Sequence, residues 1–131
     1  TAPVLSQLKR VIRTNYSNPP THGAKVVAAV LTNPELYAQW EAELAEMRDR
    51  IRDMRAALVE KLQAAGVEQD VSFIQRQRGM FSFSGLSKDQ VARLADEFGI
   101  YAVGSGRICV AALNTSNIDA VATAMAAVMK G

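Results

Sequence analysis

One arginine in the carboxyl-terminal part of the sequence follows directly on a glycine-rich turn. Arg107 comes after the Gly-Ser-Gly turn at residues 104–106, and Ile108 and Val110 then alternate with Arg107 and Cys109 as in a short strand. Such a turn holds the guanidinium in a fixed place, and its planar fork suits two-point binding of a carboxylate. The pattern indicates a carboxylate receptor. The alternative is an ordinary hairpin arginine in a surface ion pair.

Helical periodicity predicts the elements that position this residue. Residues 3–15 and about 21–31 are predicted to be helices, and the prolines within residues 17–20 separate them. A long helix is expected from its cap, Asn33, to about residue 65, before Gly66. Its apolar seam, spaced by three or four, consists of Leu36, Trp40, Leu44, Met47, Ile51, Met54, Leu58 and Leu62. The opposite, charged face carries Glu41, Arg48, Arg52 and Arg55, and we expect it to be solvated.

Shorter elements follow the long helix. Strands are expected at about residues 71–75 and around Phe81, where phenylalanine alternates with serine. Ser87 and Gln90 form a capping-box pattern that opens a helix ending at Gly99. That helix is expected to bury Val91, Leu94, Ala95 and Phe98.

The last segment adds strands around Tyr101 and Ile108 and a final helix, which a capping pattern at residues 116–119 opens. The order of helices and strands predicts an α+β fold, with the helices packed on a small, mainly antiparallel sheet. The sequence shows no internal repeat.

Three stretches, residues 13–24, 79–86 and 101–114, resemble the aspartate and aromatic amino-acid aminotransferases of fold type I, which use pyridoxal phosphate. The motifs occur in the family's order and approximate spacing, and they match the carboxyl-terminal third of such an enzyme. The resemblance implies that residues 1–32 belong to the large-domain and dimer interface. It also implies that residues 33–131 form the small domain that clamps the substrate.

The resemblance implies roles for five residues. Arg107 would hold the α-carboxylate of the substrate, and Phe81 would flank its side chain unless it is simply a core aromatic. Arg13 would reach the neighbouring subunit's active site and bind the side-chain carboxylate of a dicarboxylic substrate. The residues alone favour an interaction of Arg13 with its own helix end. Ser17 and Asn18 would lie beside the same entrance, although both are also common turn formers.

The family's Schiff-base lysine and its other cofactor-binding motifs are absent from this sequence. The resemblance therefore implies a homodimeric pyridoxal-phosphate enzyme that acts on amino acids and 2-oxo acids, of which this segment alone is inactive. Residues 7–10 and 106–115 look closer to the aromatic enzymes than to the aspartate enzymes. The alternative from another class is a stand-alone, non-catalytic α+β module for carboxylate binding or dimerisation.

Composition indicates the cellular compartment and the class of partner. The single cysteine, Cys109, fits a reducing cytoplasm and is expected to be a packing residue. No apolar run approaches the length of about 18 residues that a membrane span requires. The net charge is +2, yet residues 1–34 carry Lys9, Arg10, Arg13 and Lys25 without any acid. Because no nucleic-acid motif accompanies these bases, we expect a small anionic substrate and neither a nucleic acid nor a membrane as partner.

Overall fold

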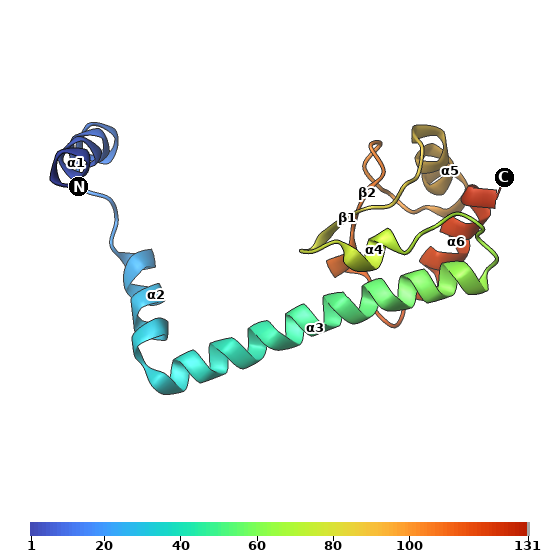
Figure 1. The fold of residues 1–131 in the computed structure, drawn as a ribbon, viewed down its shortest axis with the longest axis horizontal. Coiled ribbons are helices and arrows are strands. Elements are labelled where there is room, and N and C mark those ends of the chain that lie inside the picture. Colours follow the sequence, from blue (N-terminus) through green and yellow to red (C-terminus); the bar gives the residue numbers. More distant parts are fainter. Residues whose placement is uncertain (131) are drawn as a thin grey trace. The chain divides into compact units, whose positions relative to one another are not determined.

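The structure, a computed structural model, describes residues 1–130 and divides the chain into two compact units, Thr1–Glu43 and Leu44–Gly131. The first unit holds α1 (Ala2–Tyr16), α2 (His22–Thr32) and the beginning of α3 (Pro34–Ala64). The division falls within α3, which continues as the first element of the second unit (Figure 1).

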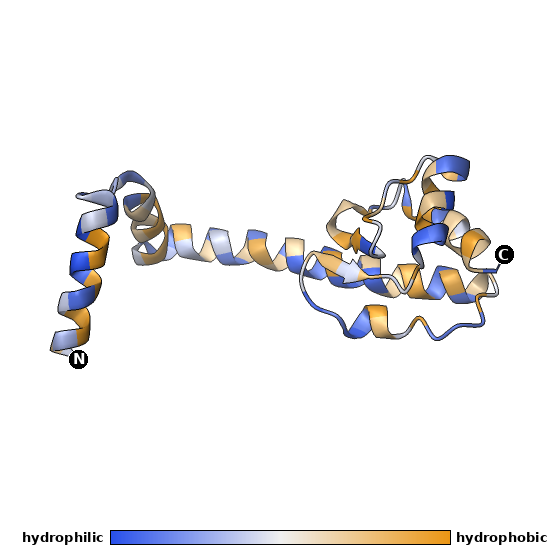
Figure 2. Ribbon diagram, turned by 90° about the horizontal axis from the view of Figure 1, so that it is seen from above, coloured by the Kyte–Doolittle hydropathy of each residue, from blue (hydrophilic) through white to orange (hydrophobic). Residues whose placement is uncertain are grey.

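Neither α1 nor α2 buries a single residue within this chain. The apolar stripe of α1, along one side of the helix (Figure 2), keeps between 48% and 65% of each side chain exposed. It consists of Val4, Leu5, Leu8, Val11 and Ile12. An amphipathic helix gains most of its stability by covering its apolar side, and no part of residues 1–130 covers this side of α1.

The predicted long helix is confirmed as α3. The side-chain oxygen of Asn33 accepts hydrogen bonds from the backbone N–H groups of Glu35 (2.9 Å) and Leu36 (3.2 Å), which caps the helix as expected. The apolar seam is buried only toward its carboxyl end, where Leu58 and Leu62 are inaccessible to solvent. Its amino-terminal members, Leu36, Trp40, Leu44 and Met47, are exposed.

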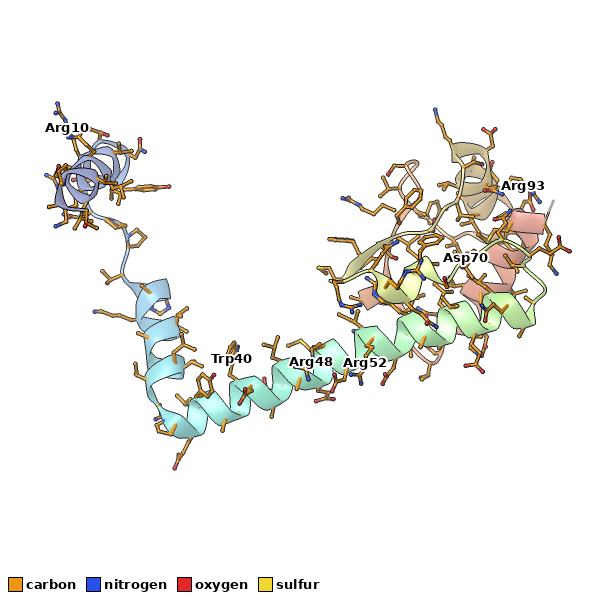
Figure 3. All side chains as sticks on the ribbon, viewed as in Figure 1. Arg10, Trp40, Arg48, Arg52, Asp70 and Arg93 are labelled. Atoms are coloured by element: carbon orange, nitrogen blue, oxygen red, sulfur yellow. The ribbon has the colours of Figure 1, made fainter. Side chains whose placement is uncertain are left out.

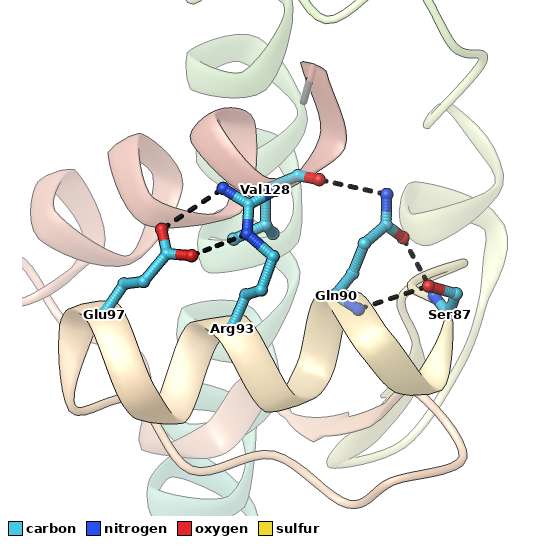
Figure 4. A network of polar contacts seen from close by, with 5 residues as sticks. All are labelled: Ser87, Gln90, Arg93, Glu97 and Val128. Atoms are coloured by element: carbon cyan, nitrogen blue, oxygen red, sulfur yellow. Dashed lines mark hydrogen bonds and ion pairs between the residues drawn. The ribbon is translucent and has the colours of Figure 1, made fainter.

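The second unit builds one hydrophobic core from α3, α5 (Lys88–Phe98) and α6 (Ile118–Lys130). Figure 1 shows α6 beside the carboxyl-terminal half of α3 and α5 beside α6. The capping box is confirmed, because the Ser87 hydroxyl accepts from the Gln90 backbone and the Gln90 side chain accepts from the Ser87 backbone (Figure 4). The amide nitrogen of Gln90 also donates to the carbonyl of Val128 (3.1 Å), which joins α5 to α6.

A two-stranded antiparallel sheet, β1 (Phe81–Phe83) with β2 (Arg107–Cys109), lies on this core. The register pairs Phe81 with Cys109, Ser82 with Ile108, and Phe83 with Arg107. A short helix α4 (Phe73–Arg76) precedes β1, and a 3-10 turn η1 (Val110–Ala112) follows β2. The α+β prediction of helices packed on a small antiparallel sheet is confirmed.

The strand expected at residues 71–75 is wrong, because this segment forms α4. The side-chain oxygen of Asp70 accepts from the backbone of Ser72 (2.8 Å) and starts a turn. Val71 and Ile74 are both buried at a spacing of three, which suits a helical turn rather than a strand.

Four further expectations about the second unit are wrong. Tyr101 lies outside any strand, and Phe98, the last residue of α5, is exposed beyond the core contacts of Val91 and Leu94. The capping expected at Ser116 is carried by Asn114, whose side-chain oxygen accepts from the backbone of residues 116 and 117. Arg55, expected on a solvated face, is only 3% exposed, because carbonyl groups of the following segment surround it.

Candidate functional site

Arg107 is the first residue of β2, and the glycine before it fixes where the strand begins. Gly106 has φ +80°, and a Cβ atom at this position would lie 2.7 Å from the carbonyl oxygen of Leu86. Only glycine fits such a conformation and such a close approach. The Gly106 carbonyl accepts from the backbone N–H of Ser84 (2.9 Å) and from the buried Ser84 hydroxyl (2.6 Å). These bonds hold the end of β1 to the start of β2.

The guanidinium of Arg107 lies over the ring of Phe81, with its central carbon 5.0 Å from the ring centroid. This distance is in the range of a cation–π interaction. Within residues 1–130, no carboxylate lies within ion-pair distance of Arg107, so the surface ion pair considered from the sequence does not form. The donors of this guanidinium therefore remain available for an external anion.

Arg107 and Phe81 both line a cavity of about 270 Å³ in the second unit. Most of its other walls are apolar, and they include Ile100, Tyr101, Ile108, Val121 and Met125. A cation at the wall of an apolar cavity suits a ligand that combines a carboxylate with an apolar tail. Phe81 is 47% exposed, which makes it a wall of this cavity rather than a residue of the core.

Arg13, Ser17 and Asn18 lie together at the carboxyl end of α1, in the first unit. A terminal nitrogen of Arg13 donates to the Ser17 carbonyl oxygen (3.0 Å), which is the helix-end interaction that the residues alone favour. Ser17 has φ +60°, and the backbone of Asn18 donates to the Tyr16 carbonyl (2.7 Å). All three predicted residues are exposed and belong to one tight turn.

Sequence reasoning missed the buried polar network behind β1. Arg55, Ser82 and Gln77 form this network, and each makes hydrogen bonds to the segment that contains Phe81. The available signal was the spacing of Arg55, which stands four residues after Ile51 and three before Leu58, next to the apolar seam. That position favours the inner face of α3 over the solvated one.

Comparisons with known proteins identify the family of this chain. The profile of the family described as "Aminotransferase class I and II" matches residues 1–125. The aspartate aminotransferase of Pseudomonas aeruginosa is 68% identical over 98% of this chain and 32% of its own length. The chain belongs to the class I and II aminotransferases, in the branch that contains the aspartate and aromatic amino-acid enzymes.

Solved structures support the same assignment. The aromatic-amino-acid aminotransferase of Burkholderia pseudomallei, covalently bound to pyridoxal phosphate, matches with a TM-score of 0.94 and 72% identity, over 98% of this chain and 32% of that one. A psychrophilic aromatic aminotransferase from Psychrobacter sp. B6, cocrystallised with aspartic acid, also has a TM-score of 0.94, at 46% identity over 99% and 33% of the two chains. The chain thus spans about a third of the length of its relatives.

None of the lysines of this chain suits the role of the amine that would bind pyridoxal phosphate. Lys9, Lys25, Lys88 and Lys130 are exposed. Lys61 pairs with Asp119, and this hydrogen bond raises the pKa of the Lys61 ammonium, whereas a nucleophilic lysine needs a lowered pKa. Residues 1–130 also contain no cluster of side chains suited to a metal ion, and none of their helices could cross a membrane.

Proposed function

We propose that this chain is the carboxyl-terminal part of a pyridoxal-phosphate aminotransferase, in which Arg107 binds the α-carboxylate of the amino acid or 2-oxo acid. The observation that carries the proposal is a guanidinium at the wall of an apolar cavity, without a carboxylate partner among residues 1–130, fixed by Gly106 and by its stacking on Phe81. A two-point, charge-assisted pair orients a carboxylate as well as binding it. Every substrate of such an enzyme shares this group, so Arg107 would serve all of them.

The cofactor would be held by residues outside this chain, since none of its lysines fits. When bound, pyridoxal phosphate supplies an electron sink for amino-group transfer. The residues of this chain orient the substrate: Arg107 fixes one end, and the ring of Phe81 limits the space beside its side chain. The 131-residue chain alone would be inactive.

Arg13 would bind the side-chain carboxylate of a dicarboxylic substrate in the active site of a neighbouring subunit, with Ser17 and Asn18 at its entrance. Its exposure at the end of α1, where its guanidinium donates to the Ser17 carbonyl, supports a role beyond that of a helix cap. The uncovered apolar stripe of α1 supports placing residues 1–32 at the large-domain and dimer interface of a homodimer. Residues 33–131 would form the domain that clamps the substrate.

The substrates would be aromatic amino acids, together with acidic ones and 2-oxo acids such as 2-oxoglutarate. The apolar cavity beside Arg107 supports an aromatic tail, and Arg13 supports a second carboxylate. The relatives include both kinds of enzyme by name. We place the enzyme in the cytoplasm, which the single cysteine supports.

The test is Arg107→Ala in the full-length enzyme, assayed with phenylalanine and with aspartate. We expect kcat/KM to fall by about 100-fold or more for both substrates, because both lose the pair to the α-carboxylate. Arg48→Ala, which changes an exposed arginine of α3 (Figure 3), is the matched control and should leave kcat/KM unchanged. An Arg107→Ala enzyme with normal kcat/KM would refute the assignment.

A further inference from the structure

Arg55 of α3 is a buried cation that makes four hydrogen bonds, all of them to one short segment. One terminal nitrogen donates to the Ile74 carbonyl (3.0 Å) and to the Ser82 hydroxyl (2.9 Å). The other donates to the carbonyls of Gly79 (2.7 Å) and Phe81 (2.8 Å). No carboxylate of residues 1–130 lies within ion-pair distance of it.

Stability alone gives a weak reason for this arrangement. Burying a charge without a counter-ion costs free energy, and here burial lowers the pKa of Arg55, with the charge of Arg78 adding to the effect. Apolar residues often replace buried ionic groups without loss of stability. A guanidinium, however, offers donors in a rigid planar fork, and so it fixes the relative places of several acceptors at once.

The acceptors of Arg55 lead directly to the carboxylate site. The Ser82 hydroxyl donates to the side-chain oxygen of Gln77 (2.7 Å), and the same oxygen accepts from the backbone of Phe83 (2.8 Å). Phe83 stands opposite Arg107 in the ladder, and Phe81 lies under the Arg107 guanidinium. The network therefore joins α3 to the strand that holds both the ring and the partner of Arg107.

We propose that Arg55 is a positioning residue for substrate binding: its fork fixes β1 on α3, and the ring of Phe81 on that strand thereby sets where Arg107 meets the carboxylate. This inference rests on the proposed function of Arg107. It predicts that Arg55 contributes to ligand affinity only through Arg107, although it touches no ligand itself.

The experiment uses the full-length enzyme and 3-phenylpropanoate, a monocarboxylate with an aromatic tail that has no amino group to transfer. The dissociation constant is measured for Arg55→Met and for Arg55→Lys. Lysine keeps the charge but has a single ammonium nitrogen in place of the planar fork. We expect both variants to bind about 10- to 100-fold more weakly, because a small displacement of Arg107 disrupts two-point binding. Arg52→Met is the control, since Arg52 is exposed on the same helix (Figure 3) and should bind normally.

A thermodynamic cycle with Arg107→Ala separates positioning from general damage. In the Arg107→Ala background, Arg55→Lys should weaken binding by less than about twofold, because the group through which it acts is gone. Amide hydrogen exchange should become faster in residues 81–83 and 107–109 while the core of α6 keeps its protection. The proposal would be overturned if Arg55→Lys lost the same affinity with and without Arg107. It would also be overturned if the exchange of the α6 amides became faster to the same extent.

The remaining outcomes separate this inference from the proposed function. If Arg107→Ala binds 3-phenylpropanoate as the unchanged enzyme does, the proposed function fails. If Arg107→Ala loses binding while Arg55→Lys matches Arg52→Met, only the role of Arg55 fails. The lysine variant keeps the charge and the buried stem, so it decides the matter even where Arg55→Met does not fold.

Discussion

Arg107 and Arg55 carry the same guanidinium group in opposite surroundings. Arg107 is exposed and has no carboxylate partner within residues 1–130, whereas Arg55 is buried and bonded to four acceptors. The first arrangement leaves donors for a ligand, and the second uses them to order the backbone. The two proposed roles are complementary, because a carboxylate receptor works only if its geometry is held within narrow limits.

Arg13→Ala tests the proposed second carboxylate site in the full-length enzyme. We expect kcat/KM to fall by about 100-fold or more for aspartate and glutamate, because the substrate's second carboxylate would lose its partner in the site. For phenylalanine and tyrosine the loss should stay below about fivefold. The measurement is kcat/KM for all four amino acids.

Arg10→Ala is the matched control for Arg13, since Arg10 is an exposed arginine on the same helix (Figure 3). It should leave the ratio of acidic to aromatic activity unchanged. Equal losses for acidic and aromatic substrates in Arg13→Ala would contradict a selective role and favour a helix-end role instead.

Among the elements, α5 shows how a local signal sets a tertiary contact. Its capping box fixes the first turn, and the same Gln90 side chain donates to the end of α6, while Arg93 and Glu97 pair on the surface (Figure 4). The hydrogen bond from Arg93 lowers the pKa of the Glu97 carboxyl. The pair therefore stabilises α5 at pH values above the ordinary carboxyl pKa. This stabilisation is lost as the pH falls through the lowered pKa of Glu97.

Ser87→Ala should destabilise the region around α5 by about 1 kcal/mol, the usual cost of losing a serine cap. Hydrogen exchange of the α5 amides in the full-length enzyme measures this loss. Ser105→Ala, at an exposed serine outside any helix, should leave the exchange of α5 unchanged. Unchanged protection of α5 in Ser87→Ala would show that the packing of Val91 and Leu94, rather than the cap, determines its stability.

Signals that act within a few residues made the elements predictable. The caps at Asn33 and Ser87 involve partners two or three residues away, so the sequence alone places these helix starts correctly. Arg55 could not be placed in this way, because its acceptors stand 19 to 27 residues later in the chain. The strand prediction for residues 71–75 failed for a related reason, since a short apolar run takes a helical or an extended form according to its neighbours.

The site was only partly predictable for the same reason. The turn before Arg107 and the alternation around Phe81 indicate two strands, but their antiparallel pairing and the stacking of the two side chains depend on tertiary structure. The bonds from Ser84 to Gly106 span 22 residues, and the sequence marks neither end as a partner of the other.

For the whole molecule, the uncovered helices α1 and α2 are the main feature of the first unit. The 131-residue chain produced alone should show no aminotransferase activity with added pyridoxal phosphate, since no lysine of the chain fits the cofactor. It should also self-associate through the apolar stripe of α1. Sedimentation velocity measures the self-association, and an aspartate–2-oxoglutarate assay measures the activity.

A double variant, Leu8→Ser with Ile12→Ser, provides the control for self-association. Both side chains belong to the stripe of α1, and their replacement should reduce the sedimentation coefficient toward that of a monomer. If the 131-residue chain without substitutions were a monomer, the expected self-association would be contradicted. Turnover by that chain would contradict the placement of the cofactor outside it.

The ladder of β1 and β2 contains three residue pairs, so strand length contributes little to its register. A shift by one residue would turn every side chain of the shifted strand to the opposite face of the sheet. An insertion or deletion of one residue inside either strand would therefore separate Phe81 from Arg107. In evolutionary terms, we expect relatives of this chain to differ in length at surface turns, whereas the two three-residue strands should keep their length unchanged.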